Sequence, residues 1–294
     1  MIQRGLMSTT PQVTANFFPE SAFRYLDHDA IVCVDVLTTT TTLVTAVAEG
    51  WRVVLGGTAK ASILKASNPI TVGDAAEEGT VKKWPPRQWP GRPRSTPELA
   101  RFDCPDSPVA VLARGDRDRP LQLASGVGLD LISNAYTGPS VYIASLRNMT
   151  ATAAHVARAH RRVAVLGACT AGVLLCEDQI AVSRIAASLC EHGFEPGESG
   201  VSELIRRWST AEISLGRLGA SAEQLRRHGR QADVDFAFTH VDDLDLICRV
   251  EQGEIVSVER AAAVPRRIAG ARPASVRASA RTRATAASSI RRLR

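Results

Sequence analysis

Residues 31–50, which read IVCVDVLTTTTTLVTAVAEG, constrain the fold more than any other stretch of the chain. Residues 31–34 form a short, wholly apolar run rich in β-branched side chains, which is typical of a strand covered on both faces in a parallel sheet. Asp35 ends this run, five threonines follow at 38–42, and apolar residues then recur at helical spacing until Gly50. The pattern predicts a strand, an acid, a hydroxyl-rich turn and a helix.

Such a junction lies at the carboxyl edge of the strands, where ligands of open α/β sheets usually bind. Free backbone N–H groups at a helix N-terminus suit anions such as phosphate. A carboxylate in the position of Asp35 can hold a hard cation beside that anion. The alternative interpretation is that Asp35 and one threonine merely cap the helix.

Strands and helices continue to alternate along the chain. Further strands are expected at 52–55, 70–72, 121–124, 141–144 and 163–166, and helices at 59–66, 129–135, 150–160, 177–190, 202–208 and 221–228. A hairpin is expected from 246–250 and 254–258, around Gln252 and Gly253. Because this spacing indicates βαβ units, we predict one α/β domain, a three-layer α/β/α sandwich with a mostly parallel sheet.

Residues 80–108 interrupt the alternation. Two tryptophans and several prolines in this stretch rule out a regular helix or a central strand. A loop of this length in a compact domain is more often a functional cover than a connector, and a disordered segment is the alternative.

Charge divides the chain at residue 264. The net charge is +6, but residues 265–294 hold nine arginines and no acid, so the rest of the chain carries −3. We predict an α/β domain over 1–264 and a disordered Arg-rich tail over 265–294. The arginines of the tail could bind nucleic acid weakly. The acidic body gives such binding no further support.

The sequence gives no indication of a membrane partner. No apolar run approaches the ~20 residues of a membrane span, and the first ten residues contain no apolar core of a secretory signal. The six cysteines form no C-x-x-C pair, which favours free thiols in a reducing cytoplasm over disulfides or a zinc site. We therefore expect a cytoplasmic protein. The sequence is compatible with a homo-oligomer.

Three more predicted strand ends carry small, polar or acidic residues, namely Ser125-Gly126, Asn148 and Glu177-Asp178. The carboxyl ends of parallel strands lie at one edge, so we expect these residues to converge on Asp35. Carboxylates beside anion-binding turns suggest a Mg²⁺-assisted reaction on a phosphorylated small molecule. The alternative for Glu177 and Asp178 is that they only begin a helix, where acids favour the positive end of the dipole.

Several other phosphate and hydrolase motifs are absent from the sequence. There is no Walker lysine motif, and residues 35–38 lack the Asp-x-Asp pair of aspartyl-phosphate phosphatases. Residues 125–128, Ser-Gly-Val-Gly, form neither a G-x-S-x-G elbow nor a dinucleotide-binding fingerprint.

The order of these junctions resembles the 2-phosphosulfolactate phosphatase family over roughly residues 30–259. Residues 35–42 resemble the family's Asp-Val-Leu-Arg-Ala-Thr-Thr-Thr, and Ser107-Pro108 resembles its Asn-Ser-Pro. Ser125-Gly126 stands where the family has Thr-Thr-Asn-Gly-Thr, and residues 145–148 are similar to its Ser-x-x-Asn turn. Residues 167–178 are similar to its glycine-containing turn that ends in Glu-Asp.

The resemblance implies Mg²⁺-dependent hydrolysis of a small phosphorylated acid, with 2-phospho-3-sulfolactate as the family's substrate. The residues expected to bind Mg²⁺ and carry the catalysis are Asp35, Glu177 and Asp178. Those expected to bind the substrate are Thr40, Thr41, Ser125, Gly126, Asn148 and Arg147.

The chain departs from the family pattern at two arginine positions. Thr38 stands at one, and Ala75 stands where the family has the arginine of Gly-Glu-Arg. Arginine is the side chain best suited to bidentate recognition of phosphate or sulfonate, and Arg147 is the expected partial substitute. The alternative function is therefore a family member that binds a metabolite or a partner without turnover.

Overall fold

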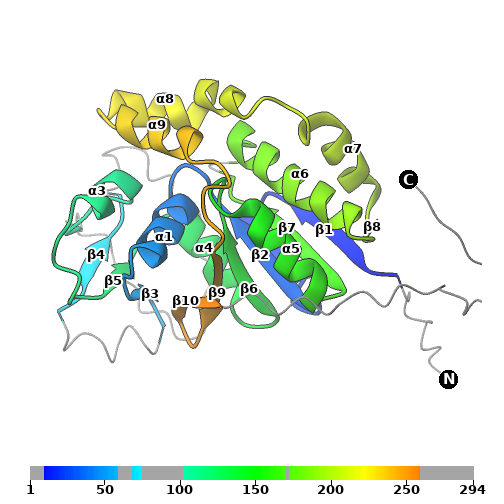
Figure 1. The fold of residues 1–294 in the computed structure, drawn as a ribbon, viewed down its shortest axis with the longest axis horizontal. Coiled ribbons are helices and arrows are strands. Elements are labelled where there is room, and N and C mark those ends of the chain that lie inside the picture. Colours follow the sequence, from blue (N-terminus) through cyan, green and yellow to red (C-terminus); the bar gives the residue numbers. More distant parts are fainter. Residues whose placement is uncertain (1–9, 59–67, 75–101, 170–171, 259–294) are drawn as a thin grey trace, which may run out of the picture. The chain divides into compact units, whose positions relative to one another are not determined.

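The computed structural model describes residues 10–58, 68–74, 102–169 and 172–258, all within one compact unit, Met1–Ala261 (Figure 1). The expected helix at 59–66, most of the loop at 80–108 and the tail at 265–294 lie outside the described residues. The division at residue 264, the disorder of the tail and its weak nucleic-acid binding therefore stay predictions.

Ten strands of the described residues form one sheet in the order β4-β5-β3-β10-β9-β6-β2-β7-β1-β8. Their bounds are β1 Gln12–Asn16, β2 Ala30–Val34, β3 Val53–Leu55, β4 Ile70–Val72, β5 Leu121–Leu123, β6 Ser140–Ala144, β7 Arg162–Gly167, β8 Glu195–Pro196, β9 Ile247–Glu251 and β10 Glu254–Val258. Six of the pairings among these strands are parallel, and the three that involve the β9–β10 hairpin with β3 and β6 are antiparallel. The predicted mostly parallel sheet is confirmed.

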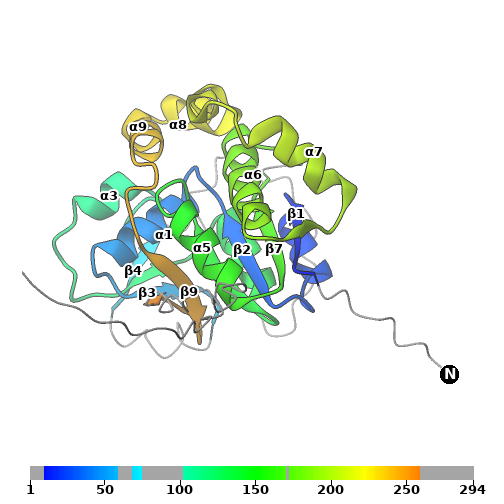
Figure 2. The ribbon, with the colours of Figure 1, turned by 45° about the vertical axis from the view of Figure 1, so that its right-hand side comes forward.

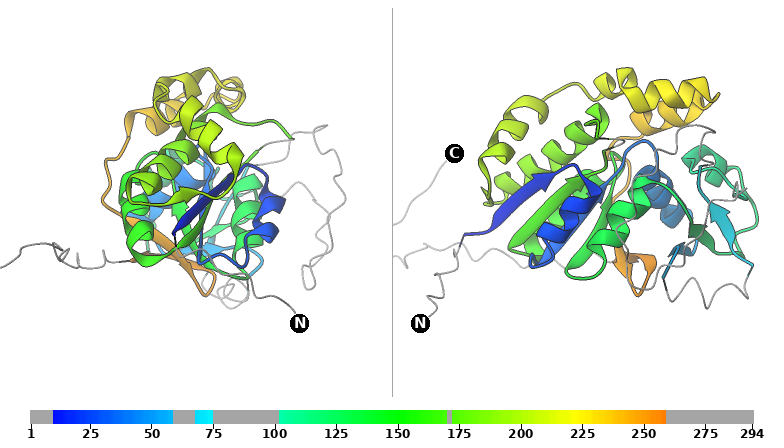
Figure 3. Two further views of the ribbon diagram at one scale, coloured as in Figure 1. Left: turned by 90° about the vertical axis from the view of Figure 1, so that its right-hand side faces the viewer. Right: turned by 180° about the vertical axis from the view of Figure 1, so that it is seen from behind.

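Helices cover both faces of this sheet. They are α1 Thr39–Ala48, α3 Pro108–Leu112, α4 Val127–Ala135, α5 Met149–Ala159, α6 Cys176–Glu191, α7 Ser199–Trp208, α8 Ala220–Arg227 and α9 Gln231–Thr239, with 3-10 turns η1 Pro19–Arg24 and η3 Ile213–Leu218. Helices α5 and α6 lie in front of the central strands in Figure 1 and in Figure 2, whereas the reverse view in Figure 3 brings η1 and α4 forward. The predicted α/β fold with helices on either side of the sheet is confirmed.

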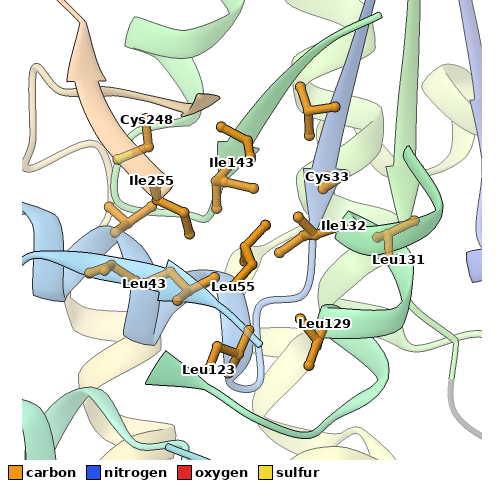
Figure 4. Close-up of a cluster of buried hydrophobic side chains, with 14 of the residues drawn as sticks. Cys33, Leu43, Leu55, Leu123, Leu129, Leu131, Ile132, Ile143, Cys248 and Ile255 are labelled. Carbon is orange, nitrogen blue, oxygen red and sulfur yellow. The ribbon is translucent and has the colours of Figure 1, made fainter. Parts of the chain in front are cut away.

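Strand β2 contributes side chains to the apolar clusters on both faces of the sheet. Its side chains alternate between the faces, so Ile31 and Cys33 join the cluster that includes Leu43 of α1 and Leu129 of α4, part of which is drawn in Figure 4. Val32 and Val34 point into the second cluster, against α5 and α6. Burial on both faces explains why this strand has no polar residue until Asp35.

The structure differs from the sequence-based expectation in several elements. Helix α1 begins at Thr39, so four of the five threonines are helical and not part of a turn. Strands β1 and β8 and helices α3 and α9 were not expected; β1 is short and largely polar, β8 has two residues and α3 has five. The signal for α9 is the spacing of Val234, Ala237 and Phe238, which are buried together on one helical face.

Two findings concern the helices and the cysteines of the described residues. None of their helices is long and apolar enough to cross a membrane. All six cysteines are free thiols, four of them buried.

Substitution of Ile143 tests the importance of the layer between β6 and α1. This side chain is fully buried in the sheet's central part, so Ile143→Ala should lower the free energy of unfolding by about 2–5 kcal/mol. The matched control is Leu218→Ala, because Leu218 is 81% exposed and its truncation should change stability by less than about 0.5 kcal/mol. Urea unfolding of the two variants measures both, and equal losses would contradict this assignment of the core.

Candidate functional site

The site begins where β2 ends. Asp35 is only 6% exposed, and its backbone carbonyl accepts hydrogen bonds from the N–H of Thr40 at 2.9 Å and from the Thr40 hydroxyl at 2.8 Å. The Thr41 hydroxyl donates to the carbonyl of Val36 at 2.7 Å. These bonds fold residues 35–41 tightly over the first turn of α1 and fix the carboxylate of Asp35 against it.

Thr40 and Thr41 thus have hydroxyls that are buried and bound to the backbone. A threonine that donates to a carbonyl four or five residues earlier lets a helix begin inside the protein without leaving that carbonyl unsatisfied. The structure places both residues beside Asp35, as expected from the sequence. Their predicted contact with phosphate stays a prediction.

Helix α6 brings two further acids to this position. Asp178 accepts a hydrogen bond from the Val36 N–H at 2.9 Å through one carboxylate oxygen, and its other oxygen is buried without a partner. Both carboxylate oxygens of the neighbouring Glu177 are also buried without a hydrogen-bond partner. Asp35, Glu177 and Asp178 are therefore brought together at the ends of β2 and β7, as the sequence predicted.

Burial and mutual repulsion make these acids hard to ionise. Burial, with the charges of Asp106 and Glu177, raises the pKa of Asp35 to about 7. Burial, with the charges of Asp35 and Glu177, raises the pKa of Asp178 well above its usual value, and burial also raises that of Glu177. Without a cation beside them, the protonated forms of these three acids are favoured.

A fourth carboxylate, Asp106, joins the site and was missed by the sequence analysis. One of its oxygens accepts a hydrogen bond from the Thr39 hydroxyl at 2.7 Å, and the other is buried without a partner. Burial raises its pKa to about 6. The available signal was the following Ser107-Pro108, because Ser107 caps α3 and Pro108 occupies its first turn, which places Asp106 just before a helix N-terminus.

The loop from β5 to α4 reaches the same place by an unexpected path. Three antiparallel pairings separate β5 from β2, so the premise that the two strands run in parallel is wrong. The N-cap of α4, Gly126, nevertheless lies beside α1, since a Cβ there would stand 3.6 Å from the Thr39 hydroxyl oxygen. Ser125 donates a long hydrogen bond of 3.4 Å to the carbonyl of Asp74.

The Ser145–Asn148 turn lies at the end of β6, but its two predicted ligands face protein groups. The Arg147 guanidinium pairs with Asp243 at 2.6 Å and donates to the Thr45 hydroxyl at 2.9 Å. The Asn148 amide is fully buried and bonds the Ser145 N–H together with two backbone carbonyls. Both residues hold the turn in shape, and their contact with substrate stays a prediction.

The donor set fits a divalent cation of the Mg²⁺ type. Within the described ranges no three His, Cys, Asp or Glu side chains form a complete metal-binding group by themselves. Mg²⁺ does not need one, because it is commonly held by one or two carboxylates together with water and substrate phosphate. The unpartnered oxygens of Asp178, Glu177 and Asp106 are the feature that such a cation would satisfy.

Close packing of α4 on Asp35 gives a test that does not depend on activity. A methyl group at Gly128 would lie 2.5 Å from an Asp35 carboxylate oxygen and 2.5 Å from the Thr39 Cβ, so Gly128→Ala should push α4 away and destabilise the protein by about 1–3 kcal/mol. The control is Gly200→Ala in α7, where a methyl meets nothing within 4 Å and should stabilise by up to about 1 kcal/mol. Urea unfolding compares them, and a neutral Gly128→Ala would refute the close contact.

Comparison with known proteins bears directly on this site. The family model described as 2-phosphosulpholactate phosphatase matches residues 91–253, which is more than half of the chain. A protein of Symbiobacterium thermophilum described as a probable 2-phosphosulfolactate phosphatase is 28% identical over 233 residues, which cover 78% of this chain and 94% of that protein. The sequence resemblance, the α/β fold and the family match agree, and the chain belongs to the 2-phosphosulfolactate phosphatase family.

Proposed function

We propose that the protein is a Mg²⁺-dependent phosphatase that hydrolyses 2-phospho-3-sulfolactate to 3-sulfolactate and phosphate. The observation that carries this proposal is the group of buried, unpartnered carboxylate oxygens on Glu177 and Asp178 beside Asp35. Membership of the family supports hydrolysis of a phosphate ester, and the description of the Symbiobacterium relative supports the substrate.

Asp35 and Asp178 are the residues that would hold Mg²⁺, with Glu177 adding charge beside them. The Val36 N–H fixes one oxygen of Asp178 and leaves the other for the cation. When bound, the cation supplies positive charge to the phosphate oxygens as the ester bond breaks. The start of α4 at Gly126, close to the Thr39 hydroxyl, would offer backbone N–H groups to the phosphate.

A second function, binding without turnover, is favoured by one specific observation. Arg147, the expected substitute for the arginines replaced by Thr38 and Ala75, is held by Asp243 and Thr45 and stacks on Phe236. If no other cation assists the substrate's acidic groups, the chain would bind a metabolite through its carboxylate site without hydrolysing it.

Phosphate release distinguishes the two functions. The full-length protein is incubated with 2-phospho-3-sulfolactate and a panel of other phosphorylated small acids, with Mg²⁺ and with chelator. Release that requires Mg²⁺ supports the phosphatase. Intact esters together with a Tm raised by Mg²⁺ or by sulfolactate would support binding without turnover.

Asp35→Asn should abolish Mg²⁺-dependent phosphate release while leaving the protein folded. The amide keeps the size of the side chain but removes the charge, and a neutral group is tolerated there because Asp35 is buried among acids. We expect an unchanged or higher Tm without Mg²⁺ and loss of the Tm rise that Mg²⁺ produces.

The control for Asp35→Asn is Asp118→Asn, an exposed acid at the far end of β5. It removes the same charge and should leave turnover within about twofold of the parent. Full turnover by the Asp35 variant would remove Asp35 from the mechanism.

Stabilisation by Mg²⁺ should depend on pH in a defined direction. The pKa of Asp35 is raised to about 7, so at pH 5.5 the carboxyl is mostly protonated and the cation must displace a proton. At pH 8 the ionised acids repel one another and destabilise the metal-free protein. The Tm rise at a fixed Mg²⁺ concentration should therefore be larger at pH 8 than at pH 5.5, which calorimetric scans measure; an equal or smaller rise at pH 8 would count against these ligands.

A further inference from the structure

Arg230 is a cation at the edge of the carboxylate site, brought there by the N-terminus of α9. Its side chain is 18% exposed, and the guanidinium pairs with Asp233 at 2.7 Å and with Asp74 at 2.9 Å. It also donates to the backbone carbonyl of Asp106. The guanidinium is thus next to Asp106, whose carboxylate accepts a hydrogen bond from Thr39 of α1.

The position of Arg230 relates it to both missing family arginines. The Thr38 hydroxyl donates to the same Asp106 carbonyl, at 2.5 Å, that accepts from Arg230. Asp74, the other partner of Arg230, immediately precedes Ala75 in the sequence. Arg230 therefore stands between Thr38 and Asp74, whereas Arg147 reaches only the second turn of α1 through Thr45.

The two carboxylate partners of Arg230 differ in their burial. Asp233 is buried, and its carboxylate also accepts from the Ser107 hydroxyl, so this pair is fixed inside the protein. The Asp74 side chain is 52% exposed. One oxygen of Asp74 accepts from Arg230 and, at 3.2 Å, from the Asp106 N–H.

Two donors thus converge on a single carboxylate oxygen of a half-exposed side chain. An acidic group of a ligand can replace the Asp74 carboxylate on these donors without adding charge beside Arg230, because one anion leaves as the other binds. A sulfonate or carboxylate offers the same oxygen acceptors. The phosphate is left to the start of α4 and the cation beside Asp35.

We propose that Arg230 and the Asp106 N–H bind an acidic group of the substrate other than its phosphate, in the place that the Asp74 carboxylate occupies. Resting on the proposed function, this inference assigns the recognition of a substrate's second anion to Arg230 and makes Asp74 its internal competitor.

The test measures binding of phosphate-free 3-sulfolactate and of inorganic phosphate to the full-length protein by calorimetry in Mg²⁺. Arg230→Gln should weaken 3-sulfolactate binding roughly ten- to hundredfold, because one charge-assisted interaction is lost, and leave phosphate binding within about twofold. Asp74→Asn should tighten 3-sulfolactate binding, because it weakens the competitor. The control is Arg217→Gln, which removes a different ion pair to α9, with Asp235, and should change neither affinity.

Opposite effects of the two substitutions separate recognition from structural support. A merely structural Arg230 would weaken both ligands alike, and Asp74→Asn would then tighten neither; that pattern overturns the proposal, as does absence of 3-sulfolactate binding by the parent protein. If Arg230→Gln does not fold, Asp74→Asn and Arg230→Lys decide. Lactate and ethanesulfonate, tested separately, show whether the carboxylate or the sulfonate occupies the position.

The same experiment keeps this inference apart from the proposed function. Hydrolysis of 2-phospho-3-sulfolactate with affinities that do not respond to Arg230→Gln and Asp74→Asn refutes only the role of Arg230. The expected affinity changes in a protein that releases no phosphate refute turnover and leave Arg230 as the recognition residue of a binding protein.

Discussion

The burial of three acids at the start of α1 is the constraint on which the site depends. Asp35, Glu177 and Asp178 are withdrawn from water, and both carboxylate oxygens of Glu177 and one of Asp178 receive no hydrogen bond from the protein. Burying carboxylates in this way opposes folding and raises their pKa values. The two apolar clusters on either side of β2 offset that cost. The site thus lowers stability locally, and the packing of the core keeps the protein folded.

The threonine run makes such a site possible. A helix that starts inside a protein needs partners for the backbone groups that precede it, and charged caps would disturb the charge of the site. Thr40 and Thr41 instead return their hydroxyls to the carbonyls of Asp35 and Val36. Thr39 reaches across to Asp106 and connects α1 with the loop before α3. The hydroxyls thus act first as supports for the carboxylates.

Arginines in this protein are divided between support and recognition. Arg147 is enclosed by Asp243, Thr45 and the ring of Phe236, a set of partners that stabilises the turn after β6. Arg230 is anchored by the buried Asp233 but shares its outer side with the half-exposed Asp74. The difference lies in how the guanidinium is enclosed: the Arg147 side chain is 10% exposed and also donates to the fully buried Thr45 hydroxyl, whereas the outer partner of Arg230, the Asp74 side chain, is 52% exposed and can be exchanged for a ligand.

The sequence by itself determined the strand, acid and helix around Asp35, most of the sheet and the approach of Glu177 and Asp178, because these depend on local periodicity and on the edge rule for parallel strands. It did not disclose Asp106 or Arg230, nor that β5 runs opposite to β2. Only the tertiary structure decided these, since Asp106 meets Thr39 across 67 residues and Arg230 meets Asp74 across 156. Contacts between segments so far apart leave no period in the sequence, and they exist only once the sheet has twisted and the helices have packed.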